Sequence, residues 1–302
     1  MNALIVAAAY VFTPVVIPGA SSISIWGIND QGQAVVQTDI GGGLSGIYRG
    51  GTFTPLPSAG SGVKLFAFGI NNAGVVVGSK TTTADPNETG FILTGSVYKY
   101  FSRPGFTNIE GRAIGNSGLV TGTSWNLDQD GNPTSYAGFV YDPSTETFTD
   151  ATPPGAFGFI VMQGINKSGV ISGSGRQADI GGCAFIWQMG IFTNANSAAV
   201  PFLDRIRIAG GFARARGIND RGLIAGFTDA DETESSVVGF VGNSVRGFQL
   251  LTVPGATPDN GGTICEGINN WAQVTCGYTD PLPPAGTGNN HAFIGSPSED
   301  EQ

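Results

Sequence analysis

The sequence has little charge, almost no histidine and no long run of helical periodicity. Charged residues make up only 12% of the 302 positions, and there is a single His. With 48 Gly and 17 Pro, turns are too dense for long amphipathic helices, which excludes a mainly helical protein. The net charge of −9 repels phosphate backbones, so nucleic acid is not an expected partner.

The chain is also short of metal-binding and catalytic patterns. Its cysteines, Cys183, Cys265 and Cys276, show no CxxC spacing. With His291 as the one imidazole, a zinc or other transition-metal site is not expected. Phosphate-binding, dinucleotide-binding and serine-hydrolase glycine motifs are missing as well. We therefore expect neither a metal nor a cofactor.

Two acidic segments offer an alternative to a metal-free protein. Asp128–Asn132 and Asp229–Glu232 resemble the start of a calcium loop. Neither continues to the Glu at the twelfth position with which an EF-hand holds its ion. Solvated turns are the prediction for both, and calcium binding stays open as the alternative.

Cys265 and Cys276 lie on either side of the last of six similar turns. A regular four-residue turn would pair Asn269 with Gln273, and Glu266 with Cys276. That register points the two thiols to opposite faces of the hairpin. A slip to a two-residue loop would bring the thiols together. We take the regular register as the prediction and keep a disulfide as the alternative.

The two ends of the chain differ in character. Residues 1–12 are apolar but have no basic start and no charge-free stretch of spanning length, so neither a signal peptide nor membrane insertion is expected. The acidic end, 298–302, is expected to form a disordered tail. This leaves 1–297 as a single domain, which we expect to be monomeric.

One phrase, Gly-Ile-Asn-x-x-Gly or a close variant, occurs six times. Asn-x-x-Gly between apolar runs is typical of a tight turn that joins two antiparallel strands. A period of about 40–50 residues with such β-like content indicates a propeller or a solenoid. The phrase begins at Gly27, Gly69, Ala113, Gly164, Gly217 and Gly267.

Each period predicts four strands, which we name A to D. Strands A and B flank the Gly-Ile-Asn turn, strand C carries a small residue followed by an apolar pair, and strand D carries a Phe. These apolar landmarks are expected to pack between neighbouring sheets in the core. They are Ile47, Phe91, Phe139, Phe185, Phe240 and Phe293 in strand C, and Phe12, Phe53, Phe101, Phe148, Phe192 and Phe248 in strand D.

The order of strands at the two ends predicts a closed ring. The chain opens on a D-type strand at 10–17 and ends on strands A, B and C with no D after them. The N-terminal strand therefore completes the sixth sheet and hides the edges that an open array would expose. The predicted fold is an all-β, six-bladed β-propeller with four antiparallel strands in each blade.

The whole phrase resembles a known family. Phe-Thr, a Pro-Gly-Ala turn, Gly-Ile-Asn-x-x-Gly and then His291-Ala292-Phe293-Ile294 are similar to the HAF-repeat proteins of bacteria, over nearly the whole chain. The resemblance implies an exported or cell-surface β-propeller. The chain departs from the family in lacking a clear leader and in keeping the His in one repeat, which leaves a cytoplasmic location as the alternative.

Functional residues are expected on the face where the D–A and B–C connections emerge, because these vary while the A–B turns are uniform. Strand A leads from this face to the turn. Its residue before the Gly breaks the sixfold symmetry, and two positions earlier Phe66, Glu110 and Arg214 add to the variety. The residues before the Gly are Trp26, Phe68, Arg112, Gln163, Arg216 and Glu266.

This mixture of aromatic, cationic and acidic groups suits an asymmetric ligand with an apolar part and a polar or anionic part. By strand alternation Arg214 and Arg216 lie on one side, where such a pair would hold a carboxylate or a phosphate. The alternative is ordinary drift at packing positions, with charges satisfied in pairs such as Arg112 with Glu110 and Arg216 with Glu266.

Two functions remain in competition. The first is a binding or scaffold propeller that recognises a glycan, a small molecule or a protein through this face and the central channel. The second is a cofactor-free lyase, isomerase or cyclase at the mouth of the channel. Its candidate catalytic groups are Glu110, Glu266, Arg112, Arg216 and His291, although His291 has no spaced partner and a structural role is expected for it.

Overall fold

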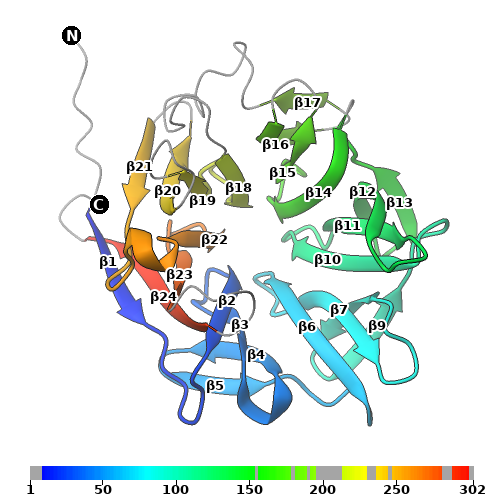
Figure 1. Ribbon diagram of the computed structural model, residues 1–302, viewed down its shortest axis with the longest axis horizontal. Coiled ribbons are helices and arrows are strands. Elements are labelled where there is room, and N and C mark those ends of the chain that lie inside the picture. The colour runs from blue at the N-terminus through cyan, green and yellow to red at the C-terminus, as the bar shows by residue number, and fades with distance from the viewer. Residues whose placement is uncertain are drawn as a thin grey trace.

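A computed structural model of the protein describes residues 9–153, 156–177, 181–188, 191–194, 213–229, 236–243, 247–280 and 288–298. These residues form six antiparallel sheets of four strands each. The sheets are arranged around a central axis, with the first strand of each repeat innermost (Figure 1). The prediction of an all-β, six-bladed propeller is therefore confirmed. No helix among the described residues is long and apolar enough to cross a membrane.

Five blades follow the chain in order, from the innermost strand outwards. The first two are β2 (Ile23–Ile28), β3 (Ala34–Thr38), β4 (Leu44–Arg49), β5 (Thr52–Pro55), and β6 (Val63–Ile70), β7 (Val76–Thr82), β8 (Thr89–Thr94), β9 (Val97–Phe101). The third and fourth are β10 (Asn108–Ile114), β11 (Val120–Leu127), β12 (Pro133–Asp142), β13 (Thr147–Asp150), and β14 (Ala156–Ile165), β15 (Ile171–Gln177), β16 (Gly181–Gln188), β17 (Ile191–Asn194). The fifth is β18 (Ala213–Ile218), β19 (Ile224–Asp229), β20 (Val237–Asn243), β21 (Gly247–Leu251). Two short 3-10 turns, Ile40–Gly42 and Pro258–Asn260, lie in connections.

The sixth blade joins the two ends of the described chain. It consists of β22 (Ile264–Ile268), β23 (Val274–Asp280), β24 (Asn289–Pro297) and, outermost, β1 (Tyr10–Pro14). Strand β1 pairs antiparallel with β24, from Tyr10 opposite Pro297 to Pro14 opposite Phe293. The predicted closure of the ring is thus confirmed. The predictions for residues 1–8 and for the acidic tail at 299–302 lie outside the described residues.

The strand-C aromatic residues form the core, as expected. Phe91, Phe139 and Phe240 are completely buried, and Phe185 and Phe293 are nearly so. Most strand-D aromatic residues are half-buried, because strand D is the outer edge of each blade, and the side chain of Phe192 lies outside the described set.

Every innermost strand contains a β-bulge just before the first residue of its repeated phrase, which is Ala113 in β10 and a Gly in the other five. The ladder with the second strand skips one residue there, and in β2 it skips Gly27 as well. A bulge leaves the extra residue unpaired and re-aims its side chain. The skipped residues are Trp26, Phe68, Arg112, Gln163, Arg216 and Glu266.

The bulge corrects the predicted cysteine register. The turn itself is as predicted, since Asn269 N donates to Gln273 O. The ladder then skips Glu266, so that Cys265, and not Glu266, lies opposite Cys276. The two sulfurs form a disulfide, and both cysteines are fully buried. The prediction of thiols on opposite faces was wrong because it assumed a regular ladder.

Loss of this disulfide is expected to lower the free energy of unfolding by about 2–3 kcal/mol, because the bond closes a short loop and restricts the unfolded chain. The double variant Cys265→Ala/Cys276→Ala, compared with the wild type in urea, measures the effect. Cys183→Ala is the control and should leave the response to reductant unchanged. Equal urea midpoints for the oxidised and reduced wild type would contradict the assignment.

The Asn of the repeated phrase holds neighbouring blades together. Its side-chain Oδ1 accepts two backbone N–H groups of its own turn, as Asn219 does from Arg221 and Leu223. Its Nδ2 donates to the carbonyl of the same turn in the next blade, at 3.0–3.3 Å. We call these inter-blade bonds the Asn clasps. They are donated by Asn29, Asn71, Asn166, Asn219 and Asn269.

The junction between the third and fourth blades has no clasp, because Gly115 stands where the other turns have Asn. The residue that follows the clasp position in each turn also differs at this junction. Elsewhere a backbone N–H such as that of Asn72 donates to a side-chain oxygen of the following blade, in that case Asn116 Oδ1. Beyond Asn116 the acceptor position is occupied by Lys167, whose side chain has no acceptor.

Gly115→Asn is expected to be about 1 kcal/mol more stable than Gly115→Ala, because its amide adds a clasp. A Cβ at Gly115 would lie 3.3 Å from Asn166 O, the carbonyl that the new amide would reach, and this tight contact is common to both variants. Urea unfolding measures the change. Gly115→Ala is the control that keeps the backbone effect without the clasp, and equal stabilities of the two variants would contradict the role assigned to the amide.

Candidate functional site

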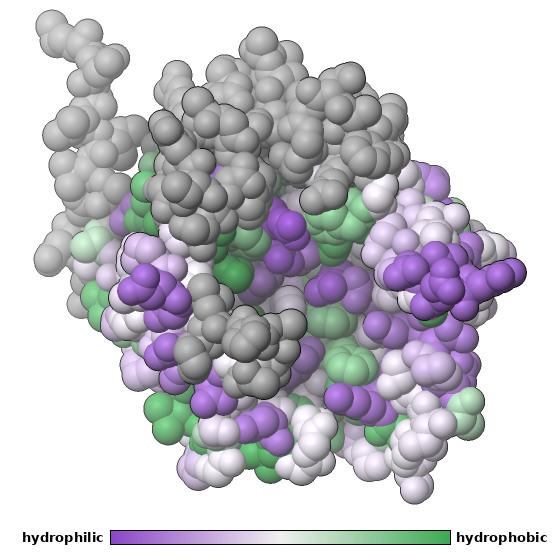
Figure 2. All heavy atoms as spheres, viewed as in Figure 1, coloured by the Kyte–Doolittle hydropathy of each residue, from purple (hydrophilic) through white to green (hydrophobic). Residues whose placement is uncertain are grey.

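Three rings of side chains line the central channel. The bulged residues form the first ring, the six Ile of the repeated phrase form the second, and the Asn turns form the third. The Ile side chains line both a cavity of about 80 Å³ on the bulge side and one of about 70 Å³ on the Asn side, so they lie between the two. We call the first cavity the neck. The surface is hollowed at the centre of the ring (Figure 2).

The structure brings most of the predicted site residues to the neck. Trp26, Phe68, Arg112, Gln163 and Glu266 line it, and Arg216 pairs with Glu266. Five predicted residues are not among those that line it, namely Phe66, Glu110, Arg214, Arg216 and His291. Phe66 lies under the ammonium of Lys64, Arg214 lies over the rings of Phe159 and Phe227, and His291 lines a different cavity.

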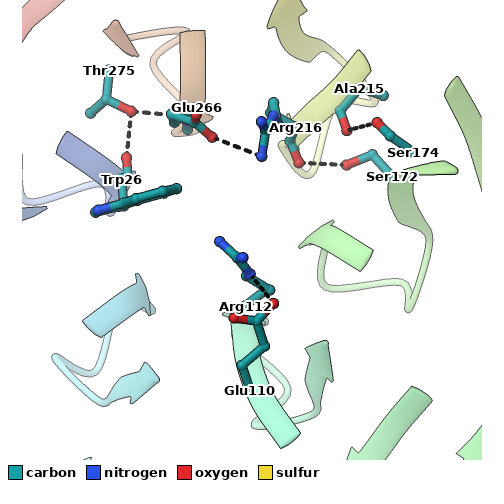
Figure 3. Close-up of polar contacts among 10 residues, drawn as sticks. Trp26, Glu110, Arg112, Ser172, Ser174, Ala215, Arg216, Glu266 and Thr275 are labelled. Carbon is teal, nitrogen blue, oxygen red and sulfur yellow. Dashed lines mark hydrogen bonds and ion pairs between the residues drawn. The ribbon is translucent and has the colours of Figure 1, made fainter. Parts of the chain in front are cut away.

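Arg112 reaches from β10 toward the centre of the ring (Figure 3). Its Nε donates to Glu110 Oε1 at 2.7 Å, and the guanidinium lies 4.2 Å from the Phe68 ring centre and 5.6 Å from that of Trp26. Such cation–π contacts hold the group without using its N–H donors. Within the described residues the Nη atoms of Arg112 donate no hydrogen bond, so they are available to a ligand.

Arg216 and Glu266 face Arg112 across the neck (Figure 3). Arg216 Nη1 lies 3.5 Å from Glu266 Oε2, and each side chain is only 14% exposed. The pair is loose. Within the described residues, Glu266 Oε2 accepts no hydrogen bond and Arg216 Nε donates none, although both atoms are buried. Of the two predicted charge pairs, Arg112–Glu110 is hydrogen-bonded and Arg216–Glu266 is not.

Burial shifts both groups of this pair toward their neutral forms. It raises the pKa of Glu266 above its ordinary value, against the opposing pull of Arg216, Arg112 and Arg214. Burial likewise lowers the pKa of the Arg216 guanidinium, while Glu266 acts in the opposite direction. The neck therefore holds charges that the protein itself compensates incompletely.

A cavity of about 250 Å³ adjoins the neck at the junction of the sixth and first blades. It shares Trp26 and Glu266 with the neck. We call it the side cavity. His291 lies in its wall, stacked on Tyr278 with ring centres 4.7 Å apart. Across the junction, Asn290 Nδ2 donates to Ser24 Oγ at 2.8 Å. Sequence reasoning missed Tyr278 and Asn290, which lie on β23 and β24 and not on the innermost strands where the ligand-binding candidates were sought.

Sequence reasoning also missed Glu88. This half-buried residue precedes β8, and its carboxylate accepts a hydrogen bond from Ser79 Oγ. Burial, and secondarily the nearby charge of Glu110, raise the pKa of Glu88. The signal that could have found it is its place at the end of a variable B–C connection next to strand A of the following blade.

The acidic segments show no metal-ligand geometry in their described parts. Asp128 accepts hydrogen bonds from the backbone N–H groups of Asp130 and Asn132, which lower its pKa. This is how a solvated turn closes on itself. Most of the segment after Asp229 lies outside the described residues. Among the residues that are described, no three His, Cys, Asp or Glu side chains stand together as a metal site.

Comparison with known proteins gives the fold and no family. No protein-family model and no curated protein matches the chain, so membership of the HAF-repeat family stays a prediction. AofleA from Arthrobotrys oligospora aligns over 95% of this chain and 86% of its own, at 10% identity and a TM-score of 0.51. The Hadza microbial sialidase Hz136 aligns over 92% and 66%, at 12% identity and a TM-score of 0.53.

The Aleuria aurantia lectin, solved with Fucα1-6GlcNAc, aligns over 96% of this chain and 100% of its own, at 11% identity and a TM-score of 0.46. The protein is thus similar in fold to AofleA and to the sialidase Hz136. Likeness at 10–12% identity extends to the fold alone, and a fold of this kind carries unrelated functions.

Proposed function

We propose that the protein is a ligand-binding propeller that takes the head group of a small molecule or glycan in the neck and its body in the side cavity. The observation that carries this proposal is the set of buried polar atoms without partners at the neck. Within the described residues these are Trp26 Nε1, Arg216 Nε and Glu266 Oε2. All three belong to the ring of bulged residues.

Burying a polar atom without a partner costs about 1–3 kcal/mol, and folded proteins keep few such atoms. The neck concentrates several of them beside the unused Nη donors of Arg112. A ligand with polar head-group atoms would supply the missing partners. The cost that the free protein bears would then contribute to affinity for that ligand.

The sizes of the two cavities suit a ligand that spans both. At about 80 Å³ the neck is too small for a whole ligand, since binding pockets usually measure about 300–1,000 Å³. The side cavity adds about 250 Å³. Its wall combines the stacked rings of Tyr278 and His291 with the polar groups of Ser24 and Asn290. Aromatic faces beside hydroxyl and amide groups suit the apolar face and the hydroxyls of a sugar ring.

Export to the cell surface or beyond belongs to the same proposal. A buried disulfide supports it, because such bonds persist mainly in oxidising compartments. The second candidate function is a cofactor-free lyase, isomerase or cyclase. The raised pKa of Glu266 favours it, since a carboxyl that keeps its proton nearer neutrality is suited to act as a general acid.

A thermal-shift screen tests the proposal, with monosaccharides, disaccharides, sugar acids and small organic acids, followed by calorimetry on each hit. Arg112→Gln in the neck and Asn290→Ala in the side cavity should each weaken a genuine hit at least tenfold. Arg221→Gln, on an exposed turn outside both cavities, is the matched control and should change nothing. Hits that bind all three variants as tightly as the wild type would place the site elsewhere. Turnover of a hit would favour the enzyme.

A further inference from the structure

We propose that the head group bound in the neck is a carboxylate, which replaces Glu266 as the counter-ion of Arg112 and Arg216, and that Glu266 takes up one proton as the ligand binds. This inference rests on the proposed function, because it presupposes that the neck is a binding site. It adds the chemical class of the ligand and a pH dependence.

The first step is the balance of donors and acceptors at the neck. Arg112 offers its Nη groups, Arg216 its buried Nε and Trp26 its indole N–H, all without an acceptor among the described residues. Among the buried atoms of the described residues, the one carboxylate oxygen at the neck without a hydrogen bond is Glu266 Oε2. A cationic head group would face two guanidinium groups. A carboxylate supplies acceptors in the paired geometry that a guanidinium prefers.

The second step is that Glu266 is the replaceable partner. Glu110 holds Arg112 through a 2.7 Å hydrogen bond to Nε, which leaves the outer edge of that guanidinium open. Glu266 lies 3.5 Å from Arg216 and forms no hydrogen bond with it. A ligand carboxylate that hydrogen-bonds to Arg216 therefore forms a better pair than the one it displaces.

The third step is the fate of the negative charge on Glu266. Burial disfavours that charge, and only Arg216 of β18, Arg112 of β10 and Arg214 of β18 favour it. Glu88 and Glu110 lie next to Arg112 and add no positive charge. A ligand carboxylate that occupies Arg112 and Arg216 removes most of this support and adds a like charge nearby. Glu266 then takes a proton from solvent, and the total charge of the neck is preserved.

Uptake of a proton makes binding stronger at lower pH. While Glu266 is ionised in the free protein and protonated in the complex, the association constant falls about tenfold for each unit that the pH rises. The window begins above the pKa of Glu266 in the free protein, which is raised from its ordinary value. The simplest ligands that test this inference are acids for which a neutral partner of the same shape exists.

The experiment uses two such pairs, D-glucuronate with D-glucose and lactate with lactamide, and calorimetry between pH 5 and 8. At each pH, buffers of different ionisation enthalpy report the number of protons taken up. The acids should bind at least tenfold more tightly than their neutral partners, with uptake of about one proton. Glu266→Gln should abolish proton uptake and retain acid binding, whereas Arg112→Gln should weaken acid binding at least tenfold.

Several outcomes would overturn the inference. If a neutral partner binds as tightly as its acid, the head group is not recognised as a carboxylate. If inorganic phosphate binds more tightly than either acid, the neck recognises a different anion. Proton uptake that persists in Glu266→Gln would assign the proton to another group. If glucose or another neutral ligand binds and is lost in Arg112→Gln, the proposed function stands and this inference fails. If no acid or neutral ligand responds to Arg112→Gln, both fail.

Discussion

Replacement of Asn269 by Ala is expected to lower the free energy of unfolding by about 2–4 kcal/mol, because it removes several buried hydrogen bonds at once. Asn269 is 3% exposed and clasps the last blade to the first through Asn29 O. Its Oδ1 also accepts the N–H groups of Trp271 and Gln273. The substitution would leave two part-buried N–H donors without their acceptor and would remove the buried clasp to Asn29 O at the junction that closes the ring. Urea unfolding at equilibrium measures the loss.

The control for Asn269 is Asn116→Ala. Asn116 is an exposed residue whose side chain accepts one inter-blade hydrogen bond, from Asn72 N. Its loss should cost less than about 1 kcal/mol. Costs of similar size for the two substitutions would mean that the clasp contributes no more than an ordinary surface hydrogen bond, and the account of blade joining would have to be abandoned.

Removal of the Arg216 guanidinium should be about as costly, and its cost should depend on pH. Arg216→Met leaves the Glu266 carboxyl buried without its nearest cation, and removal of one partner of a buried pair costs about 3–5 kcal/mol. Protonation of Glu266 relieves this cost. The pKa of Glu266 is higher in the folded protein than its ordinary value of 4.5. The protein therefore loses stability as the pH rises from 4.5 through the pKa of the folded state. The loss should therefore be small at pH 5 and largest at pH 8.

A second variant separates the charge from the packing. In Arg216→Met/Glu266→Leu no buried charge is left unpaired, so stability at pH 8 should return to within about 1 kcal/mol of the wild type. The pH dependence that Glu266 causes should vanish with it. Urea titrations at pH 5 and pH 8 on the two variants and the wild type give the comparison. If the single variant loses the same stability at both pH values, the loss comes from packing and not from the unpaired buried charge of Glu266.

Much of the fold could be predicted because the repeat restates it six times. The Asn-x-x-Gly turn is a local feature, and the chain has to reverse there in every copy. The count of strand types at the two ends then required β1 to complete the sixth blade, which the pairing of Tyr10 with Pro297 bears out. The unequal residues before each Gly could be picked out as candidates by the same logic, since a purely structural position would have repeated its residue.

The sequence by itself could determine neither the bulge nor the contacts between neighbouring blades. The disulfide depends on a shift of one residue at Glu266, because the side-chain period of a strand is two and a single extra residue reverses which side chains face each other. The clasps were equally hidden, since Asn269 and Asn29 are distant in sequence and meet only when the ring closes.

What the sequence determined, then, was the number of blades, their strand order and the closure of the ring, because these rest on local turns and on counting. What only the tertiary structure decided was which groups meet at the centre. The bulges bring side chains from six separate blades to the centre, five of them in the wall of the neck, and whether each has a partner there depends on distances between blades. Arg112 forms a hydrogen-bonded ion pair with Glu110 of its own strand. Arg216 and Glu266 come from neighbouring blades and form an ion pair without a hydrogen bond.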